Sequence, residues 1–127
     1  MLRRVFIPHP QAPLLPARLL ARYDRFIAVV RLAGGAEVEA HCVNPGRMEV
    51  LVRSGARAWV SGVAPESPRK LRYTLELLEL DGIMIGVNTQ MPNLLAETLL
   101  RERRLAGLKR YRSLEREVPY GERSRID

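Results

Sequence analysis

The residues with the clearest potential for chemistry stand in the last stretch of the sequence, where a glycine precedes charged side chains and a carboxylate. Gly121 permits a tight turn, and Ser124 to Asp127 predict a strand that presents an acidic side chain. Such a carboxylate is the hard oxygen ligand that magnesium uses in phosphodiester chemistry. One carboxylate is insufficient alone, and from the residues by themselves a solvated Asp127 with a surface pair of Glu122 and Arg123 is the favoured interpretation.

Positive charge is the second chemical signal in this chain of 127 residues, whose formal net charge is +7. Residues 1–100 hold 12 basic and 9 acidic residues, a net of +3, whereas residues 101–127 hold 9 and 5, a net of +4. Lys70 and Lys109 are the only lysines. Arginine's planar fork suits phosphate, although a GC-rich genome raises arginine content whatever the partner. The excess favours a polyanion such as nucleic acid.

Cysteine usage and hydropathy indicate a cytoplasmic protein. Cys42 is the single cysteine, which excludes an internal disulfide. No apolar run approaches the length needed to cross a bilayer, and the first residues lack the apolar core of a signal peptide. We therefore expect no membrane association.

Residue patterns predict an extended arm followed by strands. Four prolines among the first 16 residues prevent a continuous helix, so we expect an arm over residues 1–20. Residues 23–32 and 36–42 alternate around Gly34 and Gly35, which predicts a hairpin with one wet face. Further β-prone stretches follow at 48–52 and 58–63, and Trp59 is expected to anchor the core.

A second hairpin is predicted over residues 71–87. Asp81 and Gly82 supply its turn, and a slip of the apolar phase between Leu77 and Leu78 indicates a bulge. The proline-containing stretch from 62 to 70 is expected to be a surface loop.

These strands predict a mainly β chain in which residues 21–90 form a five-stranded barrel of the OB type. Pro92 opens a helix expected over residues 91–107, which Gly107 ends. Residues 108–127 then resemble the first strand or lead-in of another domain, truncated here.

Five separated segments, in this order and spacing, resemble the sugar fermentation stimulation protein A family of bacteria and archaea. They are residues 22–29, residues 41–48, residues 69–70 with 73–77, residues 87–89, and residue 117 with 120–127. The resemblance implies an OB-like first domain and a second domain similar to the restriction-endonuclease fold. Family members are about twice as long, so this chain is similar to their amino-terminal half.

The resemblance also assigns a role to Asp127. In that second fold an Asp and a later Glu-x-Lys bind metal and position the attacking water, and Asp127 matches the first of these. No Glu-x-Lys follows, so we expect no nuclease activity and no cofactor for this chain, while magnesium is a candidate cofactor of the intact protein and nuclease activity of the intact protein stays open. The family is described as DNA-binding and linked to sugar metabolism, especially that of maltose.

Basic and amide side chains in the matched segments are the candidates for contact with DNA. They are Arg22, Arg25, Asn44, Arg47, Arg69, Lys70, Arg72, Asn88, Arg123 and Arg125. A structural role has equal weight for each. OB barrels also stack bases on aromatic side chains, but the strand positions of Tyr23, Phe26, Trp59 and Tyr73 place most of them in the core. Binding is therefore expected to depend on the phosphate backbone, without sequence readout.

Three functions remain open from the sequence. The chain is a DNA-binding OB module with steep salt dependence, part of a metal-dependent nuclease, or a protein-interaction domain whose arginines are incidental.

Overall fold

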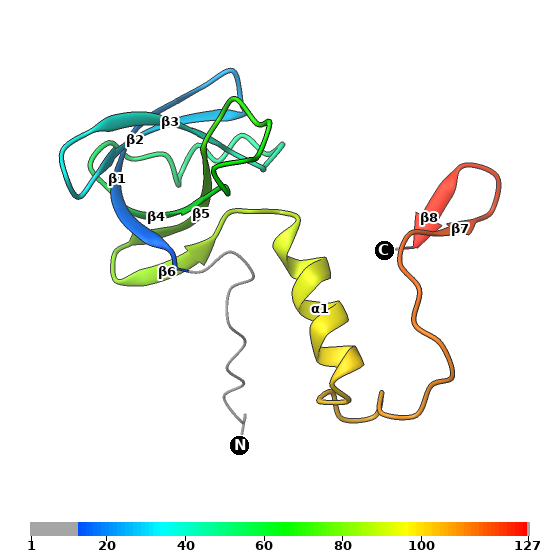
Figure 1. Ribbon diagram of the computed structural model, residues 1–127. Helices are drawn as coiled ribbons and strands as arrows, with labels where there is room; N and C mark the ends of the chain where they lie inside the picture. Colours follow the sequence, from blue (N-terminus) through cyan, green and yellow to red (C-terminus); the bar gives the residue numbers. More distant parts are fainter. Residues whose placement is uncertain (1–12, 127) are drawn as a thin grey trace. The chain divides into compact units, whose positions relative to one another are not determined.

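Strands make up most of the regular structure in the computed structural model, which describes residues 13–126 (Figure 1). The elements are β1 (Leu15–Tyr23), β2 (Ile27–Leu32), β3 (Glu37–His41), β4 (Arg57–Gly62), β5 (Tyr73–Leu80), β6 (Ile83–Gly86), α1 (Met91–Arg101), β7 (Val118–Tyr120) and β8 (Ser124–Ile126). They fall into two units, Met1–Thr89 and Gln90–Asp127. In the described residues no helix is long and apolar enough to cross a membrane.

The first unit is a closed barrel. Its strands follow the order β3-β2-β1-β4-β5-β6, and β3 also pairs with β5. All neighbours in that order are antiparallel, whereas the closing pair is parallel and joins Ala40 to Tyr73 and His41 to Thr74. Strands β1 to β5 thus close into a barrel, and β6 extends the sheet beyond β5. This topology confirms the predicted five-stranded OB barrel.

Alanine, valine and leucine side chains, together with Cys42, fill the barrel. The buried cluster consists of Ala17, Leu19, Ala28, Val30, Ala40, Cys42, Ala58, Val60, Leu75, Leu78 and Val87. The prediction that Trp59 anchors this core is wrong. Ala58 and Val60 both face inward, so strand alternation turns the residue between them to the outer surface, where Trp59 is half-buried.

Two bulges interrupt the alternation of the barrel strands. The register of β1 against β2 shifts between Leu19 and Ala21, and that of β5 against β4 shifts so that Trp59 pairs with Leu77 but Val60 pairs with Leu75. The second shift confirms the predicted bulge in β5 and places its extra residue at Glu76, just before the expected position. Each extra residue reverses the faces of the side chains that follow it.

The boundaries of the barrel differ from the expected ones. Strand β1 begins at Leu15, so residues 15–20 belong to the barrel and not to an arm. Residues 1–12 of that expected arm lie outside the described residues. The β-prone stretch 48–52 is a turn, because Met48 has a φ of 54° and its carbonyl accepts the N–H groups of Leu51 and Val52.

In the second unit, α1 ends at Arg101, earlier than the expected Gly107. Arg103 adopts a left-handed φ of 56°, the N–H of Arg104 donates to the Leu99 carbonyl, and that of Arg103 donates to the Leu100 carbonyl. This is the Schellman pattern, with an arginine where glycine is usual. The Arg103 guanidinium stacks on the Tyr111 ring 3.6 Å from its centroid, which helps to hold the strained backbone.

A short hairpin closes the described chain. Strands β7 and β8 pair Tyr120 with Ser124 around a turn in which Gly121 has a φ of 65°. The predicted turn and the strand from Ser124 to Ile126 are confirmed. In residues 108–127, expected to be the first strand or lead-in of another domain, the first strand is β7, which begins at Val118. Asp127 lies outside the described residues.

We predict that the barrel depends far more on Leu75 than on Ile83. Leu75 is 1% exposed and Ile83 is 64% exposed. Leu75→Ala leaves a cavity and should lower the free energy of unfolding by about 2–5 kcal/mol, whereas Ile83→Ala should change it by about 0.5 kcal/mol or less. Urea titrations followed by circular dichroism measure both. Equal losses would contradict the assignment of the core.

Candidate functional site

The bulge in β1 directs Arg22 toward the inside of the barrel. Before the bulge Ala17 and Leu19 face the core; after it Arg22 pairs with the fully buried Ala28, on the same face. Burying a charged side chain in the apolar interior is energetically unfavourable. Arg22 therefore stays at the end of the barrel, close to the Cys42 thiol.

There the Arg22 guanidinium binds three backbone carbonyls from two loops. Nε donates to the Arg25 carbonyl over 2.8 Å, Nη1 to the Arg47 carbonyl over 2.7 Å, and Nη2 to the Asn44 carbonyl over 2.7 Å. We call this group the Arg22 clamp. It ties the β1–β2 loop to the segment after β3, so that these two loops share one cation as their fixed point.

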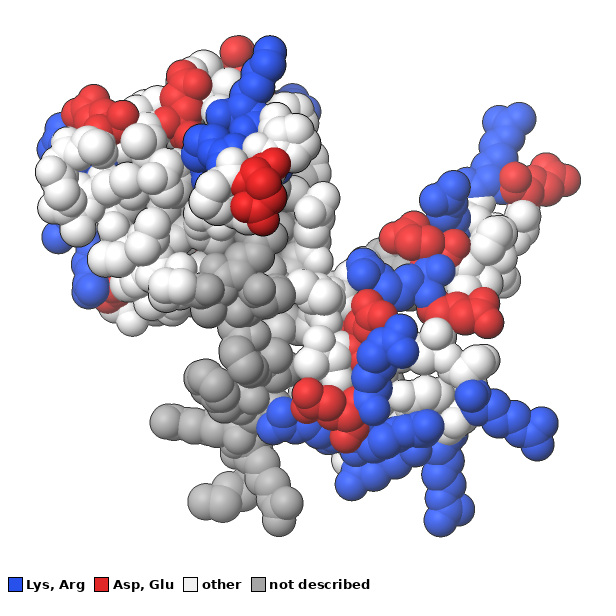
Figure 2. All heavy atoms as spheres, in the orientation of Figure 1, with Lys and Arg blue, Asp and Glu red and all other residues white. Residues whose placement is uncertain are grey.

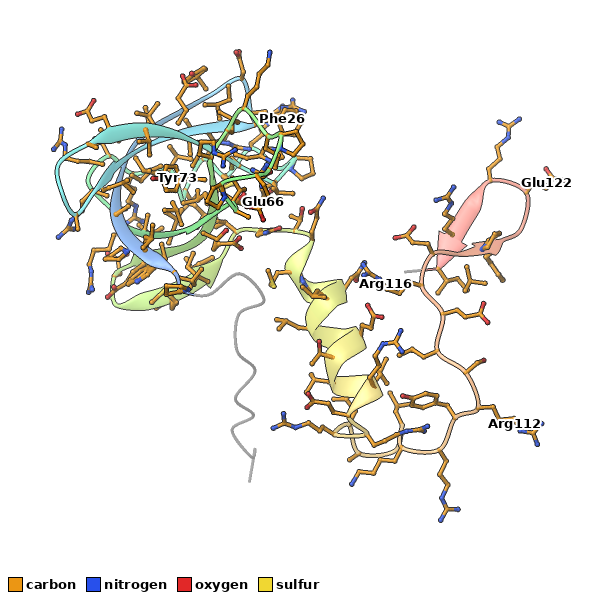
Figure 3. All side chains as sticks on the ribbon, in the orientation of Figure 1. Phe26, Glu66, Tyr73, Arg112, Arg116 and Glu122 are labelled. Atoms are coloured by element: carbon orange, nitrogen blue, oxygen red, sulfur yellow. The ribbon has the colours of Figure 1, made fainter. Side chains whose placement is uncertain are left out.

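The clamp holds the next side chains outward. Arg25 and Phe26 are exposed, Phe26 at 48%, and the Arg47 side chain is 82% exposed with a long 3.6 Å ion pair to Glu49. Figure 3 shows Phe26 on the outside of the barrel. Asp24 and Arg25 have φ values of 48° and 61°, a tight turn that the bond from Arg22 supports. We call Arg25, Phe26 and Arg47 the clamped end.

The segment after β3 is also tied to the end of β6. Asn44 accepts the Gly46 N–H at Oδ1 over 2.9 Å and donates from Nδ2 to the Val87 carbonyl over 3.1 Å. Thr89 donates to the Val43 carbonyl from both its N–H and its hydroxyl. Asn44 is therefore a turn-fixing residue whose amide is already used.

The β4–β5 loop is organised by its own arginine. Arg72 donates to the carbonyls of Ala64, Pro65, Ser67 and Arg69. A guanidinium with four backbone acceptors has little remaining capacity for a ligand.

Two basic side chains of the same loop behave differently from Arg72. Arg69 is half-buried and donates to the Thr74 hydroxyl over 3.0 Å, while Lys70 is exposed. Thr74 pairs with His41, which in turn pairs with Ile27 beside Phe26. The base of this loop therefore lies at the same end of the barrel as the β1–β2 loop.

A buried carboxylate lies in the wall of the barrel. Glu76, 4% exposed, accepts the Ser61 hydroxyl over 2.7 Å and the Asn88 amide over 3.0 Å. Asn88 also has an interaction besides this bond. Asn88 therefore hydrogen-bonds a buried carboxylate, which is the structural role that the sequence left open for it.

The basic residues of the second unit form a separate population. Arg123 lies in the turn between β7 and β8, and Arg125 is 70% exposed and 3.9 Å from Glu117. On the face drawn in Figure 2, many Lys and Arg side chains lie over this unit, with Asp and Glu side chains among them. Within the second unit, Arg101 pairs with Glu97 and Arg104 pairs with Glu102.

The structure thus sorts the eight predicted contact residues of the first unit by availability. Arg22, Asn44, Arg72 and Asn88 serve the fold, and Arg69 serves it in part. Arg25 and Arg47 are brought together, and Lys70 lies on the loop that starts from the same end. Within residues 13–126, no three His, Cys, Asp or Glu side chains gather as a metal site.

Aromatic side chains are more accessible than predicted. Tyr23 is exposed and donates to Glu39, Phe26 is exposed, and Trp59 is half-buried outside the core, so the expectation that most aromatics are internal is wrong. Only Tyr73 packs in part against the core. The bulge in β1 is the reason for Tyr23, since it moves the inward position to Arg22. The sequence signal for Phe26 was its place directly after the charged pair Asp24 and Arg25, which is typical of a turn.

Comparison with known proteins agrees with this fold. Residues 20–87 match the family model described as the SfsA N-terminal OB domain. The chain belongs to the sugar fermentation stimulation protein A family. A sugar fermentation stimulation protein homolog of Gloeobacter violaceus is 46% identical over 116 residues, and one of Geotalea uraniireducens is 44% identical over 115 residues. Both matches cover 91% of this chain and 49% of the relative.

A solved structure is similar as well. Pyrococcus furiosus SfsA, determined in complex with Ca²⁺, is 28% identical and superposes with a TM-score of 0.77, covering 91% of this chain and 48% of that one. The chain therefore spans about half the length of the relatives it matches.

We predict that the three hydrogen bonds of Arg22, and not only its positive charge, stabilise the barrel. Arg22→Lys keeps the charge but cannot reach three carbonyls, so the free energy of unfolding should fall by about 1–3 kcal/mol. The matched change Arg31→Lys affects only a surface ion pair with Glu37 and should cost about 0.5 kcal/mol or less. Urea unfolding compares the two, and equal losses would exclude a clamp.

Cys42 provides a pH-dependent test of the same region. Burial raises the pKa of the Cys42 thiol above its ordinary value of 9.0, against the opposing effect of Arg22. The folded state then holds this proton more tightly than the unfolded state. The stability from this group is complete below pH 9.0 and is lost as pH rises through the folded pKa.

Unfolding midpoints measured across this alkaline range should therefore fall more steeply for the native chain than for Cys42→Ala. The two chains share every other titrating group, so the difference isolates the thiol. Parallel pH profiles would contradict the raised pKa.

Proposed function

We propose that this barrel binds DNA through its phosphate backbone, at the clamped end and the adjoining β4–β5 loop, with little dependence on sequence. The observation that carries the proposal is the Arg22 clamp, which presents Arg25 and Arg47 together with the exposed ring of Phe26. Arginine forks suit phosphate oxygens, and an exposed ring suits an unstacked base.

The position of these residues in the barrel supports the same function. OB folds bind oligonucleotides with the loops that join their first two strands and their fourth and fifth strands. Here those loops carry Arg25 and Phe26 in one case and Arg69 and Lys70 in the other. The two loops lie at the same end of the barrel through the paired row Ile27, His41 and Thr74.

Binding should not depend on DNA sequence, because the candidate amide side chains already make hydrogen bonds within the fold. Asn and Gln amides read the edge of adenine, and both Asn44 and Asn88 are engaged in hydrogen bonds within the fold. Phosphate contacts from guanidinium groups carry no sequence information. The exposed cations of the second unit, including Arg123 and Arg125, would add to this unspecific attraction.

The cellular role that we propose is regulation linked to sugar metabolism, exerted on DNA in the cytoplasm. The relatives' name, sugar fermentation stimulation protein homolog, supports this role. A protein-interaction domain for a regulatory complex is the alternative, and it is the outcome if DNA does not bind.

A second candidate function is that of the first half of a metal-dependent nuclease. It is favoured by the length of the relatives and by the Ca²⁺ complex of the Pyrococcus furiosus protein. Asp127 would supply the first carboxylate for Mg²⁺ in a longer chain, with the present chain inactive alone. Magnesium-dependent cleavage of DNA by a full-length relative, lost on replacing the carboxylate that aligns with Asp127, is the test of this candidate.

We predict that DNA binding by this chain weakens linearly with the logarithm of salt concentration and that Arg25 and Arg47 each contribute to the slope. Arg25→Asn keeps a residue that tolerates positive φ, and Arg47→Gln keeps a similar length. Each should reduce the slope for duplex DNA by about 0.9. Fluorescence anisotropy of labelled duplexes at several salt concentrations measures it.

Arg53→Gln is the matched control. It makes the same change in net charge, and Arg53 is already paired with Asp81. It should leave the slope nearly unchanged. If all three variants shift the slope equally, the attraction is diffuse and the clamped end has no special role. If the native chain binds no DNA even at low salt, the protein-interaction function replaces the proposal.

A further inference from the structure

Three arginines lie directly opposite one another across the outer surface of the barrel. In the strand register Arg18 of β1 pairs with Arg31 of β2 on one side and with Arg57 of β4 on the other. Paired residues share a face, so the three side chains form one row. The row spans two strand spacings, about 10 Å. None of the three belongs to the clamped end.

The row keeps an uncompensated charge at its centre. Arg31 pairs with Glu37 over 2.7 Å and Arg57 with Glu79 over 2.9 Å, and these carboxylates continue the row at its two ends. Within residues 13–126, Arg18 makes no ion pair and donates only to the Gly55 carbonyl over 3.1 Å. Like charges directly opposite each other repel, so the row favours an anion at Arg18.

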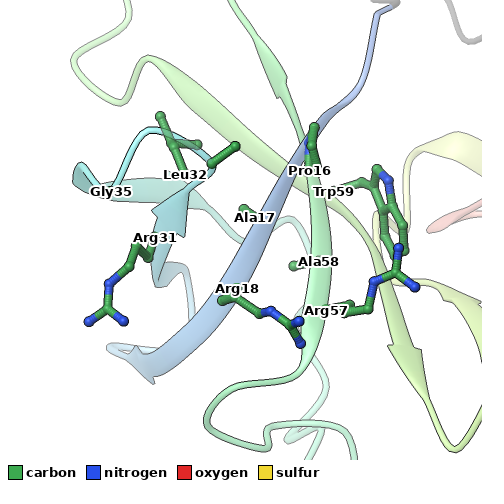
Figure 4. A pocket seen from close by; sticks show the side chains of 10 residues that line it. Pro16, Ala17, Arg18, Arg31, Leu32, Gly35, Arg57, Ala58 and Trp59 are labelled. Carbon is green, nitrogen blue, oxygen red and sulfur yellow. The ribbon is translucent and has the colours of Figure 1, made fainter.

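A groove of about 360 Å³ runs along this row. Figure 4 shows the arginines around it, with Leu32 at the end of β2 and Gly35 of the β2–β3 turn on one side and Trp59 on the other. The Arg57 guanidinium lies 5.2 Å from the centroid of the Trp59 ring. The two together form a flat, cationic platform beside the unpaired Arg18.

We infer that this groove is a nucleotide-binding site, separate from the clamped end. The phosphate of the ligand binds Arg18, and its base lies against the platform of Arg57 and Trp59. Guanidinium forks bind phosphate oxygens in a bidentate manner, and aromatic rings and guanidinium planes both stack on bases. The pairs of Arg31 and Arg57 with glutamate are surface pairs of low energy, so both arginines can also turn toward a bound anion.

The same ligand chemistry has two sources, a free nucleotide and one nucleotide unit of a single strand. A base inside a duplex is stacked and cannot reach the platform. Duplex DNA should therefore bind without occupying the groove.

The test uses Trp59 as its own reporter, because it is the only tryptophan in the chain. Tryptophan fluorescence is followed while thymidine monophosphate or a short oligothymidylate is added to the whole chain. We expect saturable quenching by at least one of them. Quenching at much lower concentration by the oligonucleotide identifies a single strand as the source, and equal concentrations per nucleotide identify the free nucleotide.

Arg18→Gln should raise the ligand concentration needed for half-maximal quenching about tenfold, the size expected for a lost charge-assisted hydrogen bond. Arg18 is exposed, so the variant should keep the native circular dichroism spectrum. Arg53→Gln, with the same change in charge on the barrel, is the control and should bind like the native chain. With thymidine monophosphate as the ligand, Arg25→Asn with Arg47→Gln should also leave the quenching unchanged, which separates this site from the proposed DNA interface.

Thermal unfolding gives a second measurement. The quenching nucleotide should raise the unfolding temperature of the native chain and not that of Arg18→Gln. The inference is overturned if neither ligand quenches saturably, or if Arg18→Gln and Arg53→Gln bind the ligand equally well.

Discussion

Closure of the barrel is the constraint on which the other features of the first unit depend. Five short strands can close only if β1 and β5 coil strongly, and each of them does so at a bulge. Both bulges reverse the faces of the residues that follow. One turns Arg22 to the barrel end, and the other places Glu76 in a bulge, where Ser61 and Asn88 satisfy it. The polar features of the barrel are thus consequences of how its sheet bends.

The Arg22 clamp shows how one side chain serves fold and binding together. It uses its donors on backbone carbonyls and leaves the side chains of Arg25 and Arg47 exposed. Because the loops are already ordered, a phosphate ligand would not have to supply the cost of arranging them. Arg22, one of the candidate DNA contacts in the sequence, therefore positions the phosphate-binding side chains that we propose, Arg25 and Arg47.

Charge is distributed differently over the two parts of the chain. On the barrel, acidic side chains pair with most of the outer arginines, as for Arg31, Arg53 and Arg57. Arg18, Arg25 and Lys70 are exposed exceptions, for which no carboxylate lies within ion-pair distance among residues 13–126. Attraction to a polyanion would then come from a few defined positions on the barrel and from the more basic second unit. This arrangement is compatible with one domain that carries both the proposed DNA interface at the clamped end and the proposed nucleotide groove.

The sequence by itself determined strands β2 to β6, both hairpins of the barrel, the loop at 62–70 and the OB class, because apolar alternation and glycine turns are local signals. It missed the first part of β1, since residues 15–20 were expected to belong to an arm. It also located Arg25 and Arg47. Tertiary structure alone decided which candidates remain available, since the register of distant strands and the two bulges set the face of each side chain. The inward Arg22, the outward Trp59 and the row of Arg31, Arg18 and Arg57 all follow from pairings between residues far apart in the chain, which no local pattern encodes.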